Sequence, residues 1–299
     1  MLAFPALGLP LALSLVGAAI AASTPKAPKA ITSCVVPGTV ALTFDDGPYK
    51  WQDDISKMLL DKGAKGTFFV NGDNYECIYS KAVSERLQRT FSAGHQICSH
   101  TWSHPDLTDL TEDEITDEFT KISDALKTIL GVSTAYMRPP YGSYNLRVRQ
   151  VAERLGQSVI TWDFERVPLP YSIGANVSQS LQYYDAAIAA RNISIALQHE
   201  TEKTTVFQLL PLVIDKLIDA GYKLVTLAEC LDQPMYTYIG SVGVYNKTTW
   251  FCPEDIATVT SSSTSYSTTS TTTSADNTAT STETTSPPSP TPKHVKGGK

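Results

Sequence analysis

The sequence predicts an α/β fold in which about seven parallel strands form a closed or nearly closed barrel. Short apolar segments alternate with amphipathic ones along the chain, and about 225 residues between two low-complexity ends are enough for one domain. Strands separated by helices run parallel, because each crossover returns the chain to the same edge of the sheet. An open doubly wound sheet is the alternative, although no glycine-rich phosphate turn follows any predicted strand.

The predicted strands are short apolar runs bounded by turn residues. In chain order they cover residues 40–44, 66–70, 96–98, 135–138, 158–162, 194–198 and 223–226. Functional groups of α/β folds lie at the carboxyl ends of the strands, so we expect the chemistry of this chain there.

The predicted helices fill intervals between the strands, at residues 52–62, 81–93, 111–130, 146–155 and 205–220. The clearest is 111–130, in which Ile115, Phe119 and Ile122 recur at steps of four and three. Thr111 and Glu114 form a capping box at its start. The other four helices each stop at a glycine, at Gly63, Gly94, Gly156 and Gly221.

Both ends of the chain differ from the middle. Residues 1–22 carry no charge and contain the apolar block Leu9–Ile20, which predicts a signal peptide too short to span a bilayer. From Thr258 to Pro290, 23 of 33 residues are Ser or Thr, so 258–299 is predicted to be a disordered, O-glycosylated tail. The expected domains are therefore one folded domain, 31–235, and a C-terminal extension, 236–257, between these two ends.

The charge of the chain excludes some partners. A net charge of −6 and the lack of a basic run argue against nucleic acid and anionic membranes. No second segment could span a membrane. The signal peptide and the glycosylation sequons at Asn176, Asn192 and Asn246 predict a secreted monomer, extracellular or in a cell wall.

Five cysteines cannot all pair within one chain. Cys34 precedes the first predicted strand and Cys230 follows the last, so a bridge between them would tie the two ends of the domain together. Cys98 occupies an apolar strand position and is predicted to be a buried free thiol. The pairing of Cys77 and Cys252 stays open.

Two adjacent carboxylates, Asp45 and Asp46, end the first predicted strand at a turn that Gly47 and Pro48 enforce. Neighbouring side chains on a strand point to opposite faces, so they share a target only where the strand ends. Such a pair can divide its work between a metal ligand and a base. A solvated acidic turn is the alternative for this segment taken alone.

His100 and His104 follow the third predicted strand, four residues apart. On one helical turn or tight loop this spacing lets both imidazoles reach one ion. With a carboxylate, two histidines leave coordination positions open for water and substrate, as a hydrolytic zinc site requires. Two ordinary surface histidines are the alternative.

Two further strand ends carry polar groups. Arg138 could pair with Asp45 and hold it ionised, and the rigid turn 139–142 could aim a backbone N–H at developing negative charge. His199 ends the sixth predicted strand and would be placed there as a general acid. A stiff surface loop and a hydrogen-bonded structural histidine are the respective alternatives.

Taken in order, four motifs resemble those of a known family: TFDDGP at 43–48, HTWSH at 100–104, RPPYG at 138–142 and L-x-H at 197–199. They look like the polysaccharide deacetylases of the NodB-homology group, carbohydrate esterase family 4. The resemblance covers roughly Ile31–Leu231, and Ile31–Pro48 and Gly221–Cys230 are similar to secreted fungal chitin deacetylases. It implies a distorted (β/α) barrel and a Cys34–Cys230 disulfide.

The resemblance also implies a metal and a base. Asp46, His100 and His104 would bind Zn²⁺ or another divalent metal such as Co²⁺. Asp45 would be the base that activates the attacking water, and Arg138 would orient Asp45.

Three more roles follow from the resemblance. The backbone N–H of Tyr141 would stabilise the oxyanion, His199 would protonate the leaving amine, and Leu197 would line the pocket for the acetyl methyl group. The implied reaction is metal-dependent removal of N-acetyl groups from a carbohydrate polymer, chitin or its oligomers. An O-acetyl esterase acting on xylan and a degenerate wall-associated carbohydrate-binding protein are the alternatives.

One motif departs from the family pattern. The family usually has W-x-x-D-x-x-D-W after its fifth strand, and the second Asp hydrogen-bonds the catalytic histidine. After Trp162 this chain has Glu165, Pro168 and Leu169 at the positions of the two Asp and the last Trp. Pro168 offers no acceptor, so His199 would lose the partner that fixes its tautomer, unless Asp163 or Glu165 replaces it. We therefore expect an active but weakened deacetylase.

Overall fold

The computed structural model describes residues 27–164 and 176–252. The chain divides into two units, Met1–Ile256 and Ala257–Lys299, and the second lies wholly outside the described residues. The predicted signal peptide, the Ser/Thr-rich tail and the departure at Glu165, Pro168 and Leu169 also lie outside them.

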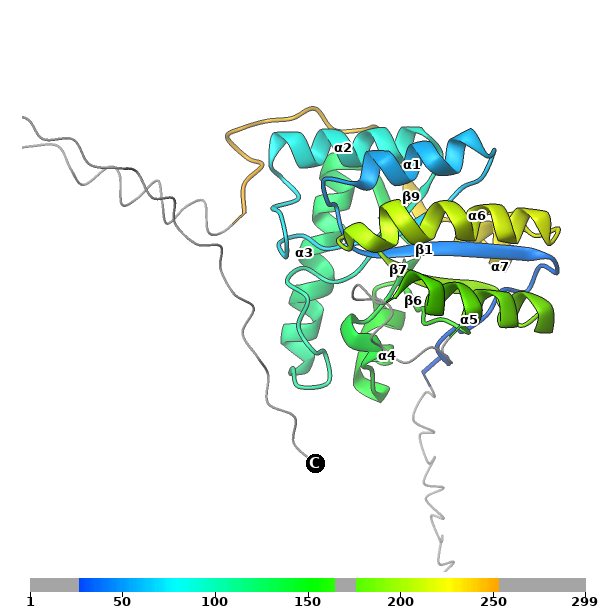
Figure 1. The fold of residues 1–299 in the computed structure, drawn as a ribbon. Helices are drawn as coiled ribbons and strands as arrows, with labels where there is room; N and C mark the ends of the chain where they lie inside the picture. The colour runs from blue at the N-terminus through cyan, green and yellow to red at the C-terminus, as the bar shows by residue number, and fades with distance from the viewer. Residues whose placement is uncertain (1–26, 165–175, 253–299) are drawn as a thin grey trace, which may run out of the picture. The chain divides into compact units, whose positions relative to one another are not determined.

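A curled parallel sheet forms the centre of the first unit (Figure 1). Its strands are β1 (Thr39–Gly47), β2 (Thr67–Val70), β3 (Gln96–Ser99), β5 (Tyr136–Met137), β6 (Ser158–Val159), β7 (Ile195–His199) and β8 (Lys223–Leu224). They pair in the order β6-β5-β3-β2-β1-β7, with β8 beside the start of β1. Along this path β6 and β7 are the two ends of the sheet, so it forms a half-barrel, and the predicted distorted barrel is confirmed.

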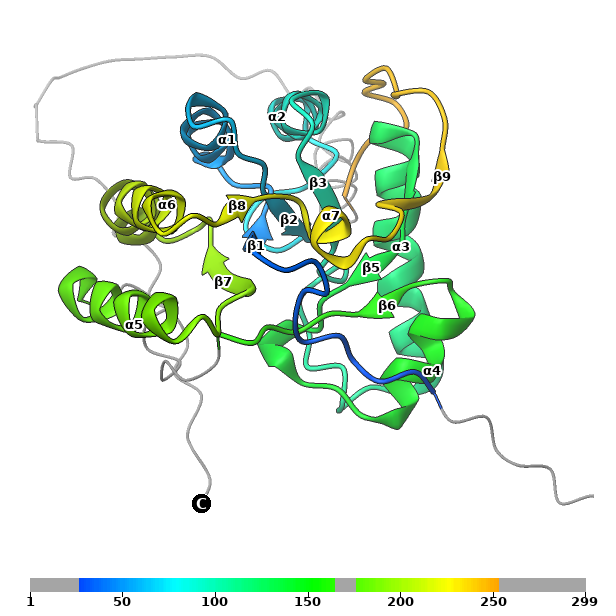
Figure 2. The same ribbon diagram turned by 90° about the vertical axis from the view of Figure 1, so that its right-hand side faces the viewer.

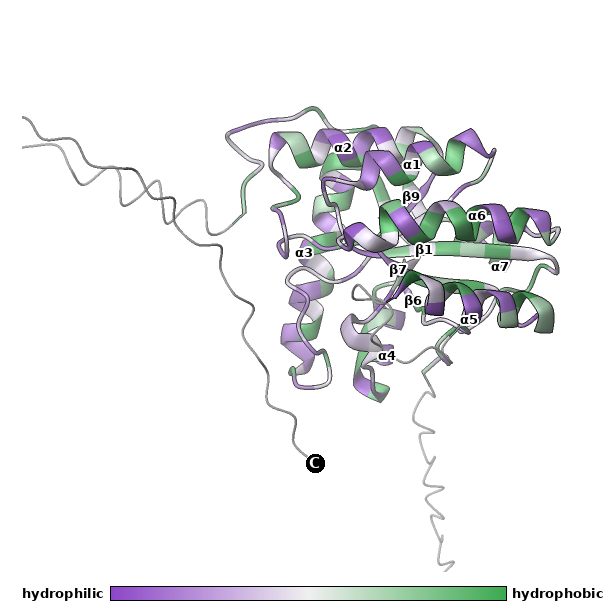
Figure 3. Cartoon of the chain, viewed as in Figure 1, coloured by the Kyte–Doolittle hydropathy of each residue, from purple (hydrophilic) through white to green (hydrophobic). Residues whose placement is uncertain are grey.

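Helices surround the strands when the sheet is viewed along its axis (Figure 2). They are α1 (Gln52–Asp61), α2 (Lys81–Ser92), α3 (Glu112–Leu130), α4 (Leu146–Arg154), α5 (Val177–Ala190), α6 (Leu210–Asp219) and α7 (Leu227–Leu231), with the short 3₁₀ turn η1 (Pro140–Gly142). Figure 3 shows hydrophobic and hydrophilic residues alternating on these helices, whereas β1 is mostly hydrophobic. Both faces of β1 are therefore covered.

Three apolar clusters result from this arrangement: one packs α3 and α4 against β5 and β6, and the other two lie on opposite faces of the sheet. The larger of these two packs helices α1, α3 and α6 against the outer face of the sheet, through side chains such as Ile55, Leu126 and Leu217. The smaller fills the barrel, where Phe69 and Cys98 meet Leu227 of α7. Because α7 packs inside the curl of the sheet, it occupies part of the barrel interior.

The predicted helix at 111–130 is α3, and its ends form as expected. The Thr111 hydroxyl accepts the backbone N–H of Glu114, and the Glu114 carboxylate accepts that of Thr111 in return. Gly131 closes the helix with φ of 73°, a left-handed conformation that favours glycine.

The predicted helix at 205–220 is interrupted. Residues Thr205–Leu209 form a π-helical turn, and α6 begins only at Leu210. Pro211 has no N–H to donate to the carbonyl of Phe207, so the regular α pattern cannot run through this point. Helix α5 and the antiparallel pair β4 (Val132–Thr134) and β9 (Tyr236–Ile239) were not predicted at all.

Residues 236–252, here called the C-terminal strap, pack on the domain. Strand β9 pairs with β4, and Cys252 forms a disulfide with Cys77. A second disulfide joins Cys34 to Cys230, and Cys98 is a buried free thiol. In 27–164 and 176–252, no helix combines the length and apolar character needed to cross a membrane.

His95 is a buried histidine between α1 and β2. Its Nδ1 accepts the backbone N–H of Gly66 at 3.0 Å, so its Nε2–H donates to the Ser56 hydroxyl, also at 3.0 Å. Burial, together with the charge of Lys65, lowers the pKa of His95 from 6.5 to about 4. The neutral ring is therefore the form that fits the fold.

We expect this histidine to make the domain acid-sensitive. The unfolded chain takes up the proton near pH 6.5 and the folded chain only near pH 4. The contribution of the neutral His95 to the free energy of unfolding is therefore fully present above pH 6.5. It falls by about 3 kcal/mol as the pH drops to 4. Urea denaturation at a series of pH values should show a smaller acid loss for His95→Gln than for the wild type, and equal losses would contradict this assignment.

Candidate functional site

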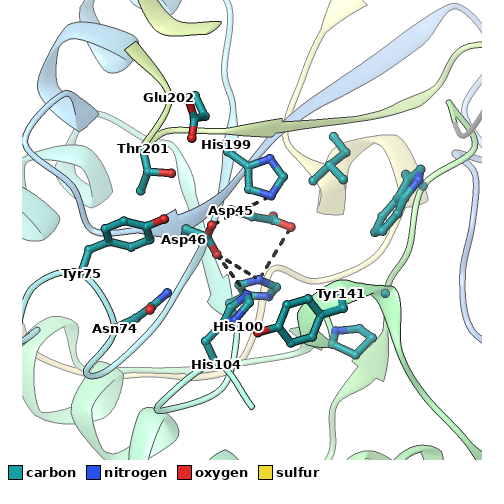
Figure 4. A pocket seen from close by; sticks show the side chains of 14 residues that line it. Asp45, Asp46, Asn74, Tyr75, His100, His104, Tyr141, His199, Thr201 and Glu202 are labelled. Atoms are coloured by element: carbon teal, nitrogen blue, oxygen red, sulfur yellow. Dashed lines mark ion pairs between the residues drawn. The ribbon is translucent and has the colours of Figure 1, made fainter. Parts of the chain in front are cut away.

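A cavity of about 510 Å³ opens at the carboxyl ends of the strands. The charged side chains in it come from strands β1 and β7 and from the loops that follow β3 and β7 (Figure 4). The sequence-predicted residues that line it are Asp45, Asp46, His100, His104, Tyr141, Leu197 and His199. Arg138 lies directly behind them, fully buried.

Asp46, His100 and His104 form one group. One ligand atom from each lies within 4.8 Å of the others. The Asp46 Oδ1 atom is buried and lies 3.2 Å from His104 Nε2 and 3.5 Å from His100 Nε2, without the alignment of a regular hydrogen bond to a described residue. Burial alone would raise the pKa of Asp46, but the close approach and the charge of the histidines outweigh it and hold this pKa far below its usual range.

The orientation of His100 fits a metal ligand. Its Nδ1 lies 2.8 Å from the backbone carbonyl of Arg138, which can only accept a hydrogen bond. The neutral ring therefore carries its proton on Nδ1 and turns the Nε2 lone pair toward Asp46. Two imidazole nitrogens and one carboxylate are a donor set that suits zinc and similar divalent cations. This group could hold such an ion.

Asp45 lies beside this group but faces a different partner. Its side chain is 3% exposed, and its Oδ1 accepts a hydrogen bond from Arg138 Nη1 at 2.8 Å. The same Nη1 donates to the Thr43 hydroxyl at 2.7 Å. The other oxygen of Asp45 is 3.9 Å from His100 Nε2, on the cavity side. The ion pair thus occupies one carboxylate oxygen and leaves the second facing the cavity.

His199 and Leu197 come from the same face of β7, two residues apart. His199 Nε2 lies 4.0 Å from Asp46 Oδ2, across the cavity from His100 and His104 (Figure 4). The Nδ1 atom of His199 is buried and has no hydrogen-bond partner among the residues that the structure describes.

Tyr141 lies in η1 with φ of 59°, and its ring packs edge-on against His104 at a centroid distance of 4.8 Å. The ring is 67% exposed, so it forms part of the cavity rim. Gly142 follows against the Trp162 ring, where a side chain at position 142 would collide. These contacts hold the turn 139–142 close to the histidines.

Asp163 does not replace the missing partner of His199. Its carboxylate accepts the backbone N–H groups of Ser194 and Ile195 at 3.0 and 2.9 Å, as well as the Ser194 hydroxyl. Asp163 therefore provides hydrogen-bond acceptors for the backbone at the start of β7, which is one end of the sheet. Glu165 lies outside the described residues.

Glu118 is a site-supporting residue that the sequence analysis missed. From α3 it reaches the histidine loop, where its Oε2 accepts the backbone N–H groups of Trp102 and Ser103, both at 2.8 Å. Its Oε1 accepts the Ser103 hydroxyl at 2.7 Å. A charged residue three positions after Ile115 interrupts the apolar stripe of α3, and this irregularity could have revealed it.

Glu200 was missed as well. It is fully buried beneath the turn that follows Asp46, and its Oε1 accepts the Tyr49 N–H at 2.6 Å. A Cβ at Gly47 would collide with this carboxylate, so the turn has room only for glycine there. Burial raises the pKa of Glu200 well above its usual value. An acidic residue directly after a buried strand was the pattern that could have indicated it.

Comparison with known proteins supports one family. A sequence model of polysaccharide deacetylases matches residues 32–160. A probable peptidoglycan-N-acetylglucosamine deacetylase of Arthroderma benhamiae is 36% identical over 235 residues, which are 78% of this chain and 50% of that protein. A chitin deacetylase of Pestalotiopsis sp is 34% identical over 213 residues, which are 71% of this chain and 70% of that protein.

A solved structure agrees with these relatives. The chitin deacetylase of Colletotrichum lindemuthianum superimposes with a TM-score of 0.66 at 29% identity, covering 72% of this chain and 97% of that one. The chain thus spans half the length of the first relative and nearly all of this structure. The resemblance that the four motifs indicated is confirmed.

We expect Glu118 to position the histidine loop. Glu118→Gln replaces the carboxylate with a neutral amide that accepts hydrogen bonds more weakly, so the loop that carries His104 should be held less firmly. Supporting residues of this kind typically change metal affinity by 10- to 100-fold, and we expect about tenfold weaker Zn²⁺ binding by isothermal titration calorimetry.

The matched control is Asp117→Asn, which removes an exposed carboxylate from the same helix that pairs only with Lys121 on the surface. It should leave Zn²⁺ affinity unchanged. Unaltered affinity in a folded Glu118→Gln variant, as judged by circular dichroism, would show that the loop does not depend on this carboxylate.

Proposed function

Because the chain belongs to the polysaccharide deacetylase family, we propose that it hydrolyses the N-acetyl groups of N-acetylglucosamine residues in chitin or chitin oligomers. The products are acetate and chitosan. The observation that carries the proposal is the grouping of Asp45, Asp46, His100, His104 and His199 around one cavity. The relatives that bear chitin deacetylase names support this substrate.

The metal-binding residues in this proposal are Asp46, His100 and His104, with Zn²⁺ or another divalent ion such as Co²⁺. When bound, such an ion lowers the pKa of water and polarises a carbonyl as a Lewis acid. The three residues leave coordination positions free, because they supply only three donors.

Asp45 is the proposed base. The Arg138 guanidinium donates a hydrogen bond to one of its oxygens at 2.8 Å, while the other oxygen faces the cavity. Asp45 takes a proton from water, and the water oxygen attacks the amide carbonyl carbon. The backbone N–H of Tyr141 is the proposed donor to the oxygen that becomes negative.

His199 completes the reaction as the proposed acid. The C–N bond breaks only when the amine nitrogen receives a proton, since an amide anion is a poor leaving group. His199 approaches from β7, opposite the metal-binding histidines, and can reach the nitrogen side of a bound acetamide. Leu197 and Trp162 line the same cavity and offer apolar contacts for the acetyl methyl group.

The proposed setting follows from the same features. The substrate is a carbohydrate polymer, and the protein acts as a secreted monomer, extracellular or in a cell wall. Two disulfides support an oxidising compartment.

A second candidate function is carbohydrate binding without efficient turnover. The Nδ1 of His199 favours it, because this atom is buried without a hydrogen-bond partner within residues 27–164 and 176–252, and a general acid without such a partner is poorly oriented. An acetylxylan esterase is a further alternative, since the same groups cleave an ester. Acetate release from chitin oligomers, from acetylated xylan or from neither distinguishes the three functions.

The two adjacent aspartates should respond differently to substitution. Asp45→Asn removes the base but none of the metal-binding atoms, so we expect unchanged Zn²⁺ binding and a kcat at least a hundredfold lower. Asp46→Asn should weaken Zn²⁺ binding itself. Calorimetry and acetate-release assays check both, and equal Zn²⁺ loss in the two variants would mean that the roles are divided wrongly.

Restoring the family motif should strengthen the acid. Pro168→Asp combined with Leu169→Trp restores the residues that the family motif has at these two positions, and we expect kcat on chitin oligomers to rise about tenfold. The control is the same pair of changes in a His199→Ala background, where kcat should not rise. An unchanged kcat in the folded double variant would count against the motif argument.

A further inference from the structure

Four aromatic side chains form a continuous row that begins at the cavity and leaves it. Tyr75 lines the cavity and lies 5.6 Å from Tyr49, which lies 4.9 Å from Trp51, which lies 5.8 Å from Phe207, measured between ring centroids. Successive rings meet edge to face. We call these four residues the aromatic ledge. Only Tyr75 belongs to the cavity itself.

The break before α6 brings Phe207 into this row. Phe207 lies in the π-helical turn Thr205–Leu209, which Pro211 imposes. Such widened turns often occur at functional sites. The start of α1, which carries Trp51, and the start of α6 lie at the same end of the domain (Figure 1).

The ledge is exposed yet fixed. Phe207 is 42% exposed and Tyr75 is 55% exposed, although both side chains are large and apolar enough to be buried elsewhere. Trp51 packs against the core, and the Tyr49 N–H is held by Glu200. Rings that are held in place lose little conformational entropy when they bind a ligand.

Polar groups accompany the rings. The Lys50 ammonium lies 5.2 Å from the Tyr49 ring and 5.0 Å from the Trp51 ring, and Lys50 itself is exposed. Glu202 and Thr201 lie at the rim where Tyr75 meets the cavity (Figure 4). The surface therefore combines apolar ring faces with donors and acceptors, as a sugar requires.

We propose that the aromatic ledge binds sugar units of the substrate chain beyond the unit that is deacetylated. This inference rests on the proposed function and names the part of the substrate that the cavity does not hold. The C–H faces of β-linked pyranose rings pack on aromatic rings, while their hydroxyl and acetamido groups take hydrogen bonds at the edge. Because the ledge starts at the cavity, one chain can occupy both.

The ledge makes chain length a determinant of affinity. A disaccharide fills the cavity and reaches Tyr75, whereas a pentasaccharide also reaches Trp51 and Phe207. The pentasaccharide therefore binds more tightly to the wild type than the disaccharide does.

The test is Phe207→Ala, compared with Leu212→Ala as the matched control. Leu212 is 45% exposed on α6, is similar to Phe207 in exposure, and is not one of the four residues of the ledge. Acetate release should show a KM for the chitin pentasaccharide that is about fivefold higher in Phe207→Ala, with unchanged kcat and an unchanged KM for the disaccharide. Phe207→Tyr should retain the wild-type KM, and Leu212→Ala should match the wild type throughout.

A binding measurement separates this proposal from the proposed function. Calorimetric titration of both oligosaccharides is performed with EDTA present, so that no turnover occurs. Tighter pentasaccharide binding that Phe207→Ala abolishes supports the ledge even if no acetate is ever released. If acetate is released and the ratio of the KM for the pentasaccharide to the KM for the disaccharide is the same in wild type and Phe207→Ala, the ledge does not bind sugar units. The proposed function is not affected by that result. Self-association of the wild type that Phe207→Ala removes, with no effect of chain length on binding, also overturns the ledge proposal.

Discussion

The buried guanidinium of Arg138 is the interaction on which the other parts of the site depend. Its side chain is fully buried, donates to Asp45 and Thr43, and lies 4.1 Å from the Phe69 ring centroid. Its backbone carbonyl fixes the His100 ring. Removing one member of a buried ion pair leaves the other charge uncompensated, at a cost of about 3–5 kcal/mol. Arg138 and Asp45 therefore stabilise each other, and one residue at the end of β5 orients both the proposed base and one proposed metal ligand.

The loops around this pair hold unfavourable backbone conformations. Asp46, Thr101, His104 and Tyr141 all have φ between 59° and 71°, although none is glycine. Left-handed conformations of such residues cost about 1–3 kcal/mol each and persist only where surrounding contacts hold them. Two buried carboxylates provide such contacts: Glu118 accepts two N–H groups from the loop around Thr101 and His104, and Glu200 accepts one from the turn after Asp46. Glu118 and Glu200 thus have a structural role, because they accept hydrogen bonds from backbone N–H groups that find no acceptor within the strained loops.

The sequence predicted what short-range patterns encode. Apolar runs predicted all seven strands of the parallel sheet, and the Thr111 and Glu114 pattern predicted the capping box of α3. Because the carboxyl ends of parallel strands share one edge, the sequence also predicted that Asp46, His100 and His104 meet. The position of Glu118 was marked by the break it makes in the apolar stripe of α3, but its hydrogen-bond partners are defined only when the helix is packed. The π turn at Thr205–Leu209 was missed because the apolar spacing predicts one continuous helix at 205–220, whereas Pro211 prevents the regular hydrogen-bond pattern there. The Cys77–Cys252 pair joins positions 175 residues apart, and nothing local indicates it.

That second disulfide links the C-terminal strap to the rim of the cavity. Cys77 belongs to the loop that carries Asn74 and Tyr75, and the same loop donates two backbone N–H groups, from Gly72 and Asp73, to the carbonyl of Trp102. A cross-link that closes so long a chain segment restricts the unfolded chain strongly and keeps the loop in place. The strap also contacts elements that support the proposed metal ligands: the Tyr236 hydroxyl accepts the Ile97 N–H of β3 at 3.0 Å, and the Gly243 N–H donates to the Ile129 carbonyl of α3 at 3.0 Å. The strap therefore supports the cavity rim and the elements behind the proposed metal ligands together, because the rim loop is hydrogen-bonded to the loop that carries His100 and His104.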